Sequence, residues 1–262
     1  MWEQIRSNKR KSILLIVLIA LVLSVLGGAI GEAVAPRGGG LLGLAVALVV
    51  WFVLCTVAYF QGGRIMLAAN GAHKISQQDH PQLWNIVEEM TIASGLPRMP
   101  DIYLMDDMTP NAFATGRDPD HAAVAVTAGL LAKLNRDQLQ GVIAHELGHI
   151  KNRDILFMTL MGATLGAIVI ISETFLRSLF SGGMHGSRYR SRRSSSDGND
   201  GGQIIMVVIA LAIAILAPIL AQLIYFAASR RREYLADASG AIFTRYPEGL
   251  ASALEVISGE AG

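Results

Sequence analysis

Long uncharged apolar runs alternate with polar segments along the chain. Four runs carry no charged residue: 13–30, 41–60, 155–172 and 203–229. A helix that crosses a bilayer needs about 17–25 apolar residues, so all four runs are long enough. Buried core helices rarely stay apolar on every face over this length. The pattern therefore predicts four membrane helices arranged as two hairpins.

The first run resembles a signal peptide, because four basic residues precede it. Its apolar core is longer than the usual 7–15 residues of such peptides, and a second run follows after about ten residues. We therefore expect a retained membrane anchor.

Basic residues near the ends of the spans predict their orientation. The four basic residues before the first run place the N-terminus in the cytoplasm, and Arg64 and Lys74 follow the second run. The polar stretch 61–154 should then be cytoplasmic, as should the chain after Arg230. The linker between the third and fourth runs disagrees, since a four-span arrangement puts its arginines outside: Arg177, Arg188, Arg190, Arg192 and Arg193. Those runs either cross fully or form a partly inserted hairpin, and both options put residues 154 and 230 on one side.

The polar stretch shows shorter periodicities. The spacing of apolar residues in 82–96 predicts an amphipathic helix, with Pro81 in its first turn. A turn and a short strand should follow in 96–105. The segments 111–116 and 122–131 read as a strand pair. Asn135 to Gln138 has the pattern of a capping box, so a helix should run from about 136 to 152. The Ser-, Gly- and Arg-rich segment 187–202 predicts a mobile loop, within a linker of 177–202.

Composition narrows the class of protein. The chain has 262 residues, of which 52% are hydrophobic and only 16% charged. The net charge of +1 gives no basic field for nucleic acid. The single cysteine, Cys55, excludes an intrachain disulfide and any multi-cysteine metal site.

Candidate chemistry lies in the sequence HELGH, residues 145–149. On a helix His145 and His149 lie one above the other, about 40° apart, so both imidazoles can reach one cation. Glu146 lies beside them and could accept a proton from a metal-activated water. The alternative is a helix end with solvated polar residues. The small residues Ala144 and Gly148 favour a packed site.

A zinc ion held by two histidines needs a third protein ligand and an open position. Glu233 and Asp237, just after the fourth run, are four residues apart and share a helix face. One could bind zinc and the other could orient a ligand histidine. A solvated charged turn that anchors the membrane helix is the alternative.

HELGH followed by REYLAD (residues 232–237), with two apolar runs between them, resembles the HtpX-type membrane zinc metalloproteases, part of the wider family that includes the prenyl-protein endopeptidases. The segments PNAFATGR at 110–117 and AAVAVTAGLL at 122–131 share this resemblance, as do the paired N-terminal runs. The likeness covers nearly the whole chain.

The resemblance implies a mainly α membrane protein: four apolar helices plus a gluzincin-like α+β catalytic domain with a small sheet. It assigns one Zn²⁺ per chain to His145, His149 and Glu233, the catalytic base to Glu146 and an orienting carboxylate to Asp237. The expected parts are a membrane hairpin (1–60), the catalytic region (61–154), a second hairpin (155–229) and a helix with the third ligand (230–262).

The same resemblance implies a zinc metalloendopeptidase that cleaves misfolded or damaged membrane proteins at the cytoplasmic face of the bacterial inner membrane, in envelope quality control and stress response. Its partners would be membrane-protein or unfolded polypeptide substrates and the lipid bilayer. The alternatives are a prenyl-protein processing protease, for which more spans are expected, and a non-catalytic membrane protein with a structural zinc site. Oligomeric state and substrate stay open.

An exposed strand edge would hold an extended substrate backbone. The candidate edge is Asn111, Ala112, Phe113 and Ala114, running to Thr115; the alternative is an ordinary hairpin strand with Phe113 in the core. The donor that stabilises the transition state is open among His121, Arg230 and Arg245. Relatives usually continue to a histidine-proline-proline segment, whereas this chain stops at SGEAG, so we expect a truncated C-terminus.

Overall fold

A computed structural model describes residues 2–36, 38–185 and 200–259. Four long helices contain the four apolar runs: α1 (Trp2–Val34), α2 (Gly39–Ala69), α6 (Ile155–His185) and α7 (Asp200–Thr244). Each is long and apolar enough to cross a membrane, which confirms the prediction of four apolar helices of membrane-spanning length. Because α6 continues to His185, residues 177–185 are helical, and the predicted 177–202 linker was too long at this end. The loop prediction for 187–202 falls largely outside the described residues, and α7 begins at Asp200.

The chain forms two compact units. One contains Lys11–Thr56 and Leu160–Ala227, and holds most of the apolar sequence. The other contains Val57–Thr159 and the chain from Ala228 onward, together with the start of α1. Asp154 and Arg232 lie in the same unit and form an ion pair, so the segments around residues 154 and 230 lie together, as the predicted parity requires.

Glycines bring α1 and α2 together in the first unit. A Cβ atom on Gly43 would lie 2.1 Å from the carbonyl oxygen of Gly27, so the two helices meet backbone against backbone. The Glu32 carboxylate accepts a hydrogen bond from the Gly40 N–H at 2.9 Å, near the turn. This close approach makes the first two apolar runs a hairpin, as predicted.

The second unit is built on a four-stranded sheet with the order β1-β2-β4-β3. The strands are β1 (His73–Lys74), β2 (Asp101–Met105), β3 (Ala112–Gly116) and β4 (Ala122–Thr127). Strands β2 and β4 are parallel, and β3 pairs antiparallel with β4 after the 3-10 turn Pro119–His121. Among the residues that the structure describes, strand β3 therefore has a neighbouring strand on one side only. The chain becomes helical after Thr127, so the predicted strand 122–131 ends four residues early.

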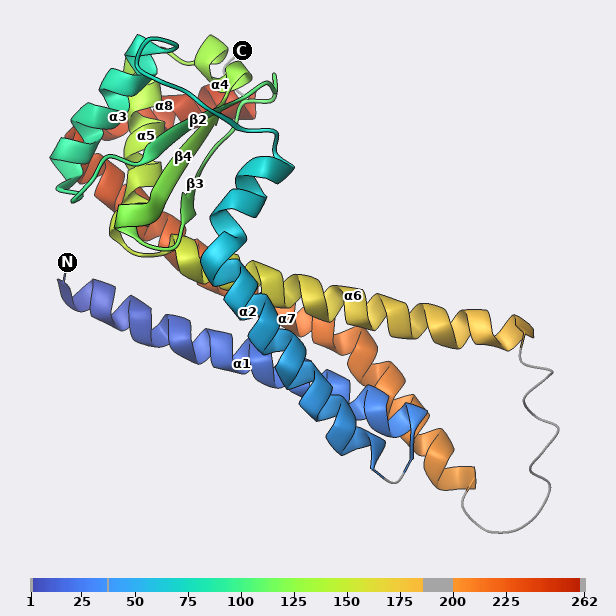
Figure 1. Cartoon of the computed structure of the whole chain (residues 1–262). Coiled ribbons are helices and arrows are strands. Elements are labelled where there is room, and N and C mark those ends of the chain that lie inside the picture. Colours follow the sequence, from blue (N-terminus) through green and yellow to red (C-terminus); the bar gives the residue numbers. More distant parts are fainter. Residues whose placement is uncertain (1, 37, 186–199, 260–262) are drawn as a thin grey trace. The chain divides into compact units, whose positions relative to one another are not determined.

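Helices cover both faces of this sheet (Figure 1). On one face lie α3 (Pro81–Ser94), α5 (Arg136–Lys151) and α8 (Pro247–Ser258), while α4 (Ala128–Lys133) follows β4. The predicted amphipathic positions of α3 are buried there: Leu83, Ile86, Val87 and Met90. The end of α2 packs on the other face, where Leu67 contacts Ala123 and Ala125. The small sheet and the helices agree with the predicted mainly α membrane protein with an α+β domain.

Candidate metal centre

The helix that carries HELGH begins at the predicted capping box. The Asn135 side chain accepts from the Gln138 N–H at 2.9 Å, and the Gln138 side chain accepts from the Asn135 N–H at 3.0 Å. A good N-cap stabilises a helix by about 1 kcal/mol. This cap fixes where α5 begins, and so places His145 and His149 in its second half.

Two glycines let α5 approach the end of α7 closely. A Cβ on Gly148 would lie 3.1 Å from the carbonyl oxygen of Ala236, and a Cβ on Gly240 would lie 3.2 Å from the His145 backbone nitrogen. The helices therefore touch along their backbones beside the two histidines. Glu233 and Asp237, on α7, are carried into the same site by this contact.

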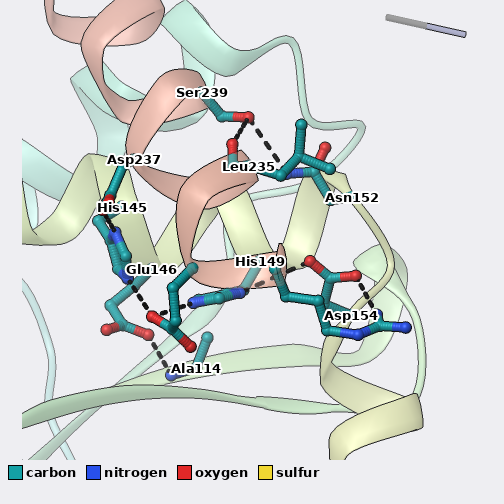
Figure 2. A network of polar contacts seen from close by, with 11 residues as sticks. Ala114, His145, Glu146, His149, Asn152, Asp154, Leu235, Asp237 and Ser239 are labelled. Atoms are coloured by element: carbon teal, nitrogen blue, oxygen red, sulfur yellow. Dashed lines mark hydrogen bonds and ion pairs between the residues drawn. The ribbon is translucent and has the colours of Figure 1, made fainter. Parts of the chain in front are cut away.

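The structure brings His145, His149 and Glu233 together, with one possible ligand atom from each within 4.8 Å of the others. The Nε2 atoms of His145 and His149 lie 3.4 and 3.7 Å from Glu233 Oε2 (Figure 2). Ligand atoms in a tetrahedral zinc site lie about 3.3 Å apart, given zinc–ligand bonds of roughly 2.0–2.1 Å. The spacing fits such an ion, and two imidazoles with one carboxylate are a ligand set of catalytic zinc sites.

The remaining ring nitrogens face other carboxylates. His145 Nδ1 lies 2.8 Å from Asp237 Oδ1, although the ring N–H is not aligned for a hydrogen bond. His149 Nδ1 lies 3.6 Å from Asp154 Oδ2. Both imidazoles therefore turn Nε2 toward Glu233 and Nδ1 toward a carboxylate. This is the arrangement that orients metal-binding histidines in proteins.

The site favours positive charge. Burial lowers the pKa of His149, but the Asp154 and Glu233 carboxylates outweigh burial and raise it to about 10. Burial likewise lowers the pKa of His145, and the bond to Glu233 and the charge of Glu146 reverse this effect, so the net shift is upward. Carboxylates that favour the protonated form of two imidazoles also favour a metal cation bound between them.

Glu146 points toward the sheet edge. Its Oε2 accepts a hydrogen bond from the Ala114 backbone N–H at 2.7 Å. Burial raises the pKa of the Glu146 carboxyl, and the two neighbouring histidines and the Ala114 N–H lower it by less. A carboxylate with a raised pKa is a stronger base, suited to accepting and returning a proton.

Strand β3 contributes a free sheet edge beside Glu146. Thr127 N donates to Asn111 O at 3.0 Å, so residue 111 pairs toward β4. Pairing alternates along an antiparallel ladder, so the N–H and C=O groups of Ala112 and Ala114 point outward. Phe113 packs against the smaller apolar cluster on the α2 face of the sheet.

Asp154 and Arg232 are functional candidates that sequence reasoning missed. Asp154 has a 1% exposed side chain, and its Oδ1 accepts from Arg232 Nη1, while the Arg232 guanidinium lies 3.7 Å from the centroid of the Phe157 ring. The pair joins the end of the HELGH helix to the residue next to Glu233. Charge alone gave no signal for it, because Arg232 belongs to a run of three arginines.

The three candidate transition-state donors lie in different places. His121 is exposed at the β3–β4 turn, where Asp118 and Arg117 hold its ring. Arg230 is exposed on α7, two residues before Arg232, and Arg245 follows the end of α7 with a φ of 53°. Among the described residues, no hydrogen bond or ion pair joins any of them to the histidine–glutamate cluster.

Known proteins resemble this chain over most of its length. The model of peptidase family M48 matches residues 77–258. The chain belongs to peptidase family M48. It is 46% identical over 258 residues to the "Protease HtpX homolog" of Thermoanaerobacter pseudethanolicus. The aligned region makes up 98% of this chain and 82% of that protein. The protein of the same name from Listeria monocytogenes is 43% identical over 261 residues, 99% of this chain and 84% of that protein.

Family membership indicates a protease, and the four apolar helices indicate a membrane protein. The chain is an integral membrane protease, and its substrates are polypeptides. The resemblance to the HtpX-type proteases is confirmed. The structure adds a candidate His/Glu metal cluster to this coarser description.

The buried pair generates a stability prediction. Asp154→Ala removes the carboxylate that accepts from the buried Arg232 guanidinium, and we expect a loss of about 3–5 kcal/mol in the free energy of unfolding. Glu89→Ala is the matched control, because it breaks an exposed pair with Arg136 (2.7 Å) worth at most about 1 kcal/mol.

Chemical denaturation of chelator-stripped protein in detergent measures both variants without a contribution from metal. Asp154→Leu combined with Arg232→Met should recover most of the loss. Equal destabilisation by Asp154→Ala and Glu89→Ala would contradict the importance of the buried pair.

Proposed function

We propose that this chain is a zinc metalloendopeptidase that cleaves misfolded or damaged membrane proteins, as part of envelope quality control in a bacterial cytoplasmic membrane. The observation that carries the proposal is the convergence of His145, His149 and Glu233 within 4.8 Å, with Glu146 on the same helix. The HtpX-type names of its relatives support the same activity.

His145, His149 and Glu233 would hold one Zn²⁺ and leave a position open. Zinc bound there supplies a Lewis acid, which acidifies water and polarises a peptide carbonyl. Glu146 is the base that takes the proton of the attacking water and passes it to the leaving amine. Its raised pKa suits both transfers, because the carboxyl must accept a proton and then return it.

Asp237 and Asp154 act as positioning residues. Each faces the Nδ1 atom of one histidine, at 2.8 and 3.6 Å, and so keeps Nε2 directed at the ligand point. Arg232 holds Asp154 in place from the residue before Glu233. One ion pair therefore links the orientation of His149 to the position of the third ligand.

The outer edge of β3 would bind the substrate as an added strand. Ala112 offers an outward N–H and C=O, and the Ala114 carbonyl faces the same way. The methyl side chains of Ala112 and Ala114 leave the backbone approachable, and the Asn111 side chain can add hydrogen bonds. Main-chain pairing tolerates many side chains, which suits a protease for misfolded proteins.

The metal assignment predicts ligand-specific losses. His145→Ala, His149→Ala and Glu233→Ala should each leave too few ligands for a tight site, so zinc content should fall from near one per chain to near zero. Asp237→Ala removes an orienting group and should weaken zinc affinity by about 10–100-fold. Metal analysis and chelator competition on purified protein measure both effects. Full zinc occupancy in Glu233→Ala, with an empty site in Asp237→Ala, would reverse the two carboxylates.

The base assignment separates metal binding from turnover. Glu146→Gln keeps the size of the side chain but cannot accept the water's proton. We expect normal zinc content and a loss of at least about 100-fold in cleavage of an unfolded model protein. A variant that cleaves at the wild-type rate would exclude Glu146 as the base, and zinc that binds without any wild-type cleavage would favour a structural site.

The edge assignment predicts the effect of a proline. Ala112→Pro removes the outward N–H that would pair with the added strand, so cleavage should fall while zinc content and thermal unfolding stay close to those of the wild type. Ala114 is left intact, because its N–H holds the Glu146 carboxylate. Asn111→Ala is the milder probe of the same edge. All three quantities are measured on one preparation. Unchanged cleavage in both variants would contradict the edge-strand proposal.

The catalytic unit should face the cytoplasm. In a Cys55→Ala background, single cysteines at the exposed positions Gln78 and Glu248 should resist an impermeant thiol reagent added to intact cells. Pro36→Cys, in the short exposed turn between α1 and α2, should react under the same conditions and serves as the positive control. Labelling at Gln78 or Glu248 before lysis would place the unit outside.

A further inference from the structure

A cavity of about 410 Å³ lies between the end of α2 and the sheet, and it contains none of the metal-cluster residues. Its wall on α2 includes Tyr59, Phe60 and Arg64, and the opposite wall comes from Tyr103 on β2 and the ends of β3 and β4. All lining residues belong to the compact unit that holds the catalytic region. The cavity is therefore a separate site on the catalytic unit.

Close packing fixes the cavity wall. A Cβ on Gly63 would lie 3.3 Å from the Gly116 backbone nitrogen, so α2 meets the end of β3 without side chains between them. Gly116 has a φ of 129°, which favours glycine at this point. The hollow beside this contact is thus held between a helix and a sheet.

Guanidinium groups dominate the charge of the cavity. Arg64, Arg98 and Arg117 line it, against the carboxylates of Asp101 and Asp120. Some of these arginines and aspartates already pair with neighbouring side chains, and others do not.

Neighbours neutralise part of this charge. Lys74 pairs with Asp101 at 3.0 Å, and Asp118 lies 3.4 Å from Arg117. Among the described residues no carboxylate pairs with Arg64 or Arg98. Two uncommitted guanidinium groups and Asp120 leave one net positive charge. This matches the net charge of −1 of a phospholipid whose headgroup adds no cation to its phosphodiester.

The sequence places the cavity wall where a membrane helix leaves the bilayer. Tyr59 and Phe60 end the uncharged run 41–60, and Arg64 is the first charged residue after it. Exposed aromatic residues at such a boundary lie at the level of the lipid headgroups. The Arg117 guanidinium carbon lies over the Tyr59 ring, 6.0 Å from its centroid, so a cation and an aromatic ring line the same part of the cavity.

We propose that this cavity binds the headgroup phosphate of an anionic phospholipid. Arg64 and Arg98 contact the phosphate oxygens, and Arg117 closes the site beside Tyr59. The acyl chains remain in the bilayer next to the apolar surface of α2. This proposal does not rest on the proposed proteolytic function.

Lipid binding to the purified full chain tests the proposal. Phosphatidylglycerol and phosphatidylcholine are titrated in neutral detergent, and bound lipid is counted by native mass spectrometry. We expect one phosphatidylglycerol to bind at least about tenfold more tightly than phosphatidylcholine. Arg64→Gln combined with Arg98→Gln should remove that preference, whereas Arg136→Gln, an exposed arginine outside the cavity, should keep it.

A second variant works in the opposite direction. Asp120→Asn removes a lining negative charge at an exposed position and should tighten phosphatidylglycerol binding. Equal affinity for the two lipids, or an unchanged preference in the double arginine variant, would overturn the proposal. Inorganic phosphate that binds as tightly as the lipid would make the cavity a site for a free anion, and displacement by an acidic peptide in preference to glycerol phosphate would make it a peptide site.

Discussion

The contact between α5 and the end of α7 is the constraint on which the candidate metal centre depends. Gly148 faces Ala236 and Gly240 faces the backbone of His145, and a Cβ on either glycine would lie 3.1–3.2 Å from the opposite backbone. At this separation a glutamate side chain reaches both imidazoles, whereas a wider spacing would take Glu233 out of range. The Asp154–Arg232 pair fixes the two helices at the end of this contact.

Four carboxylates around two histidines differ in what surrounds them. Glu233 faces both Nε2 atoms and is half exposed, with 49% of its side chain accessible. Asp154 is almost fully enclosed and bound to an arginine. Glu146 is held by a backbone N–H, and Asp237 faces a single Nδ1 atom. The roles that we propose for these four carboxylates, as ligand, base or orienting partner, follow from their different neighbours.

Local sequence patterns predicted most of the elements, because their causes lie within a few residues. The capping box predicted the start of α5, the spacing of apolar residues predicted α3, and the length of the uncharged runs predicted the four long helices. The strand prediction for 122–131 was wrong after Thr127, whose side chain accepts from the Leu130 N–H and starts a helix. The segment 177–185 was assigned to a linker on charge and composition, although it continues α6.

Contacts between distant segments were harder to predict. His145, His149 and Glu233 were grouped through the spacing of motifs and a family resemblance, and the structure brings their side chains together. The pair of Asp154 and Arg232 spans 78 residues and has no periodic signal, so nothing in the sequence joined its members. The cavity beside α2 depends on how a helix end meets a sheet, which composition does not encode.

The unpaired edge of β3 carries a cost as well as a use. An open edge can pair with any other exposed strand, and folded proteins protect such edges from aggregation. Here the edge is only five residues long and ends at Gly116, whose φ of 129° departs from strand geometry. The Glu146 carboxylate also occupies the Ala114 N–H and places a negative charge beside it. The hydrogen bond to Glu146 therefore leaves one N–H fewer on this edge for pairing with another strand.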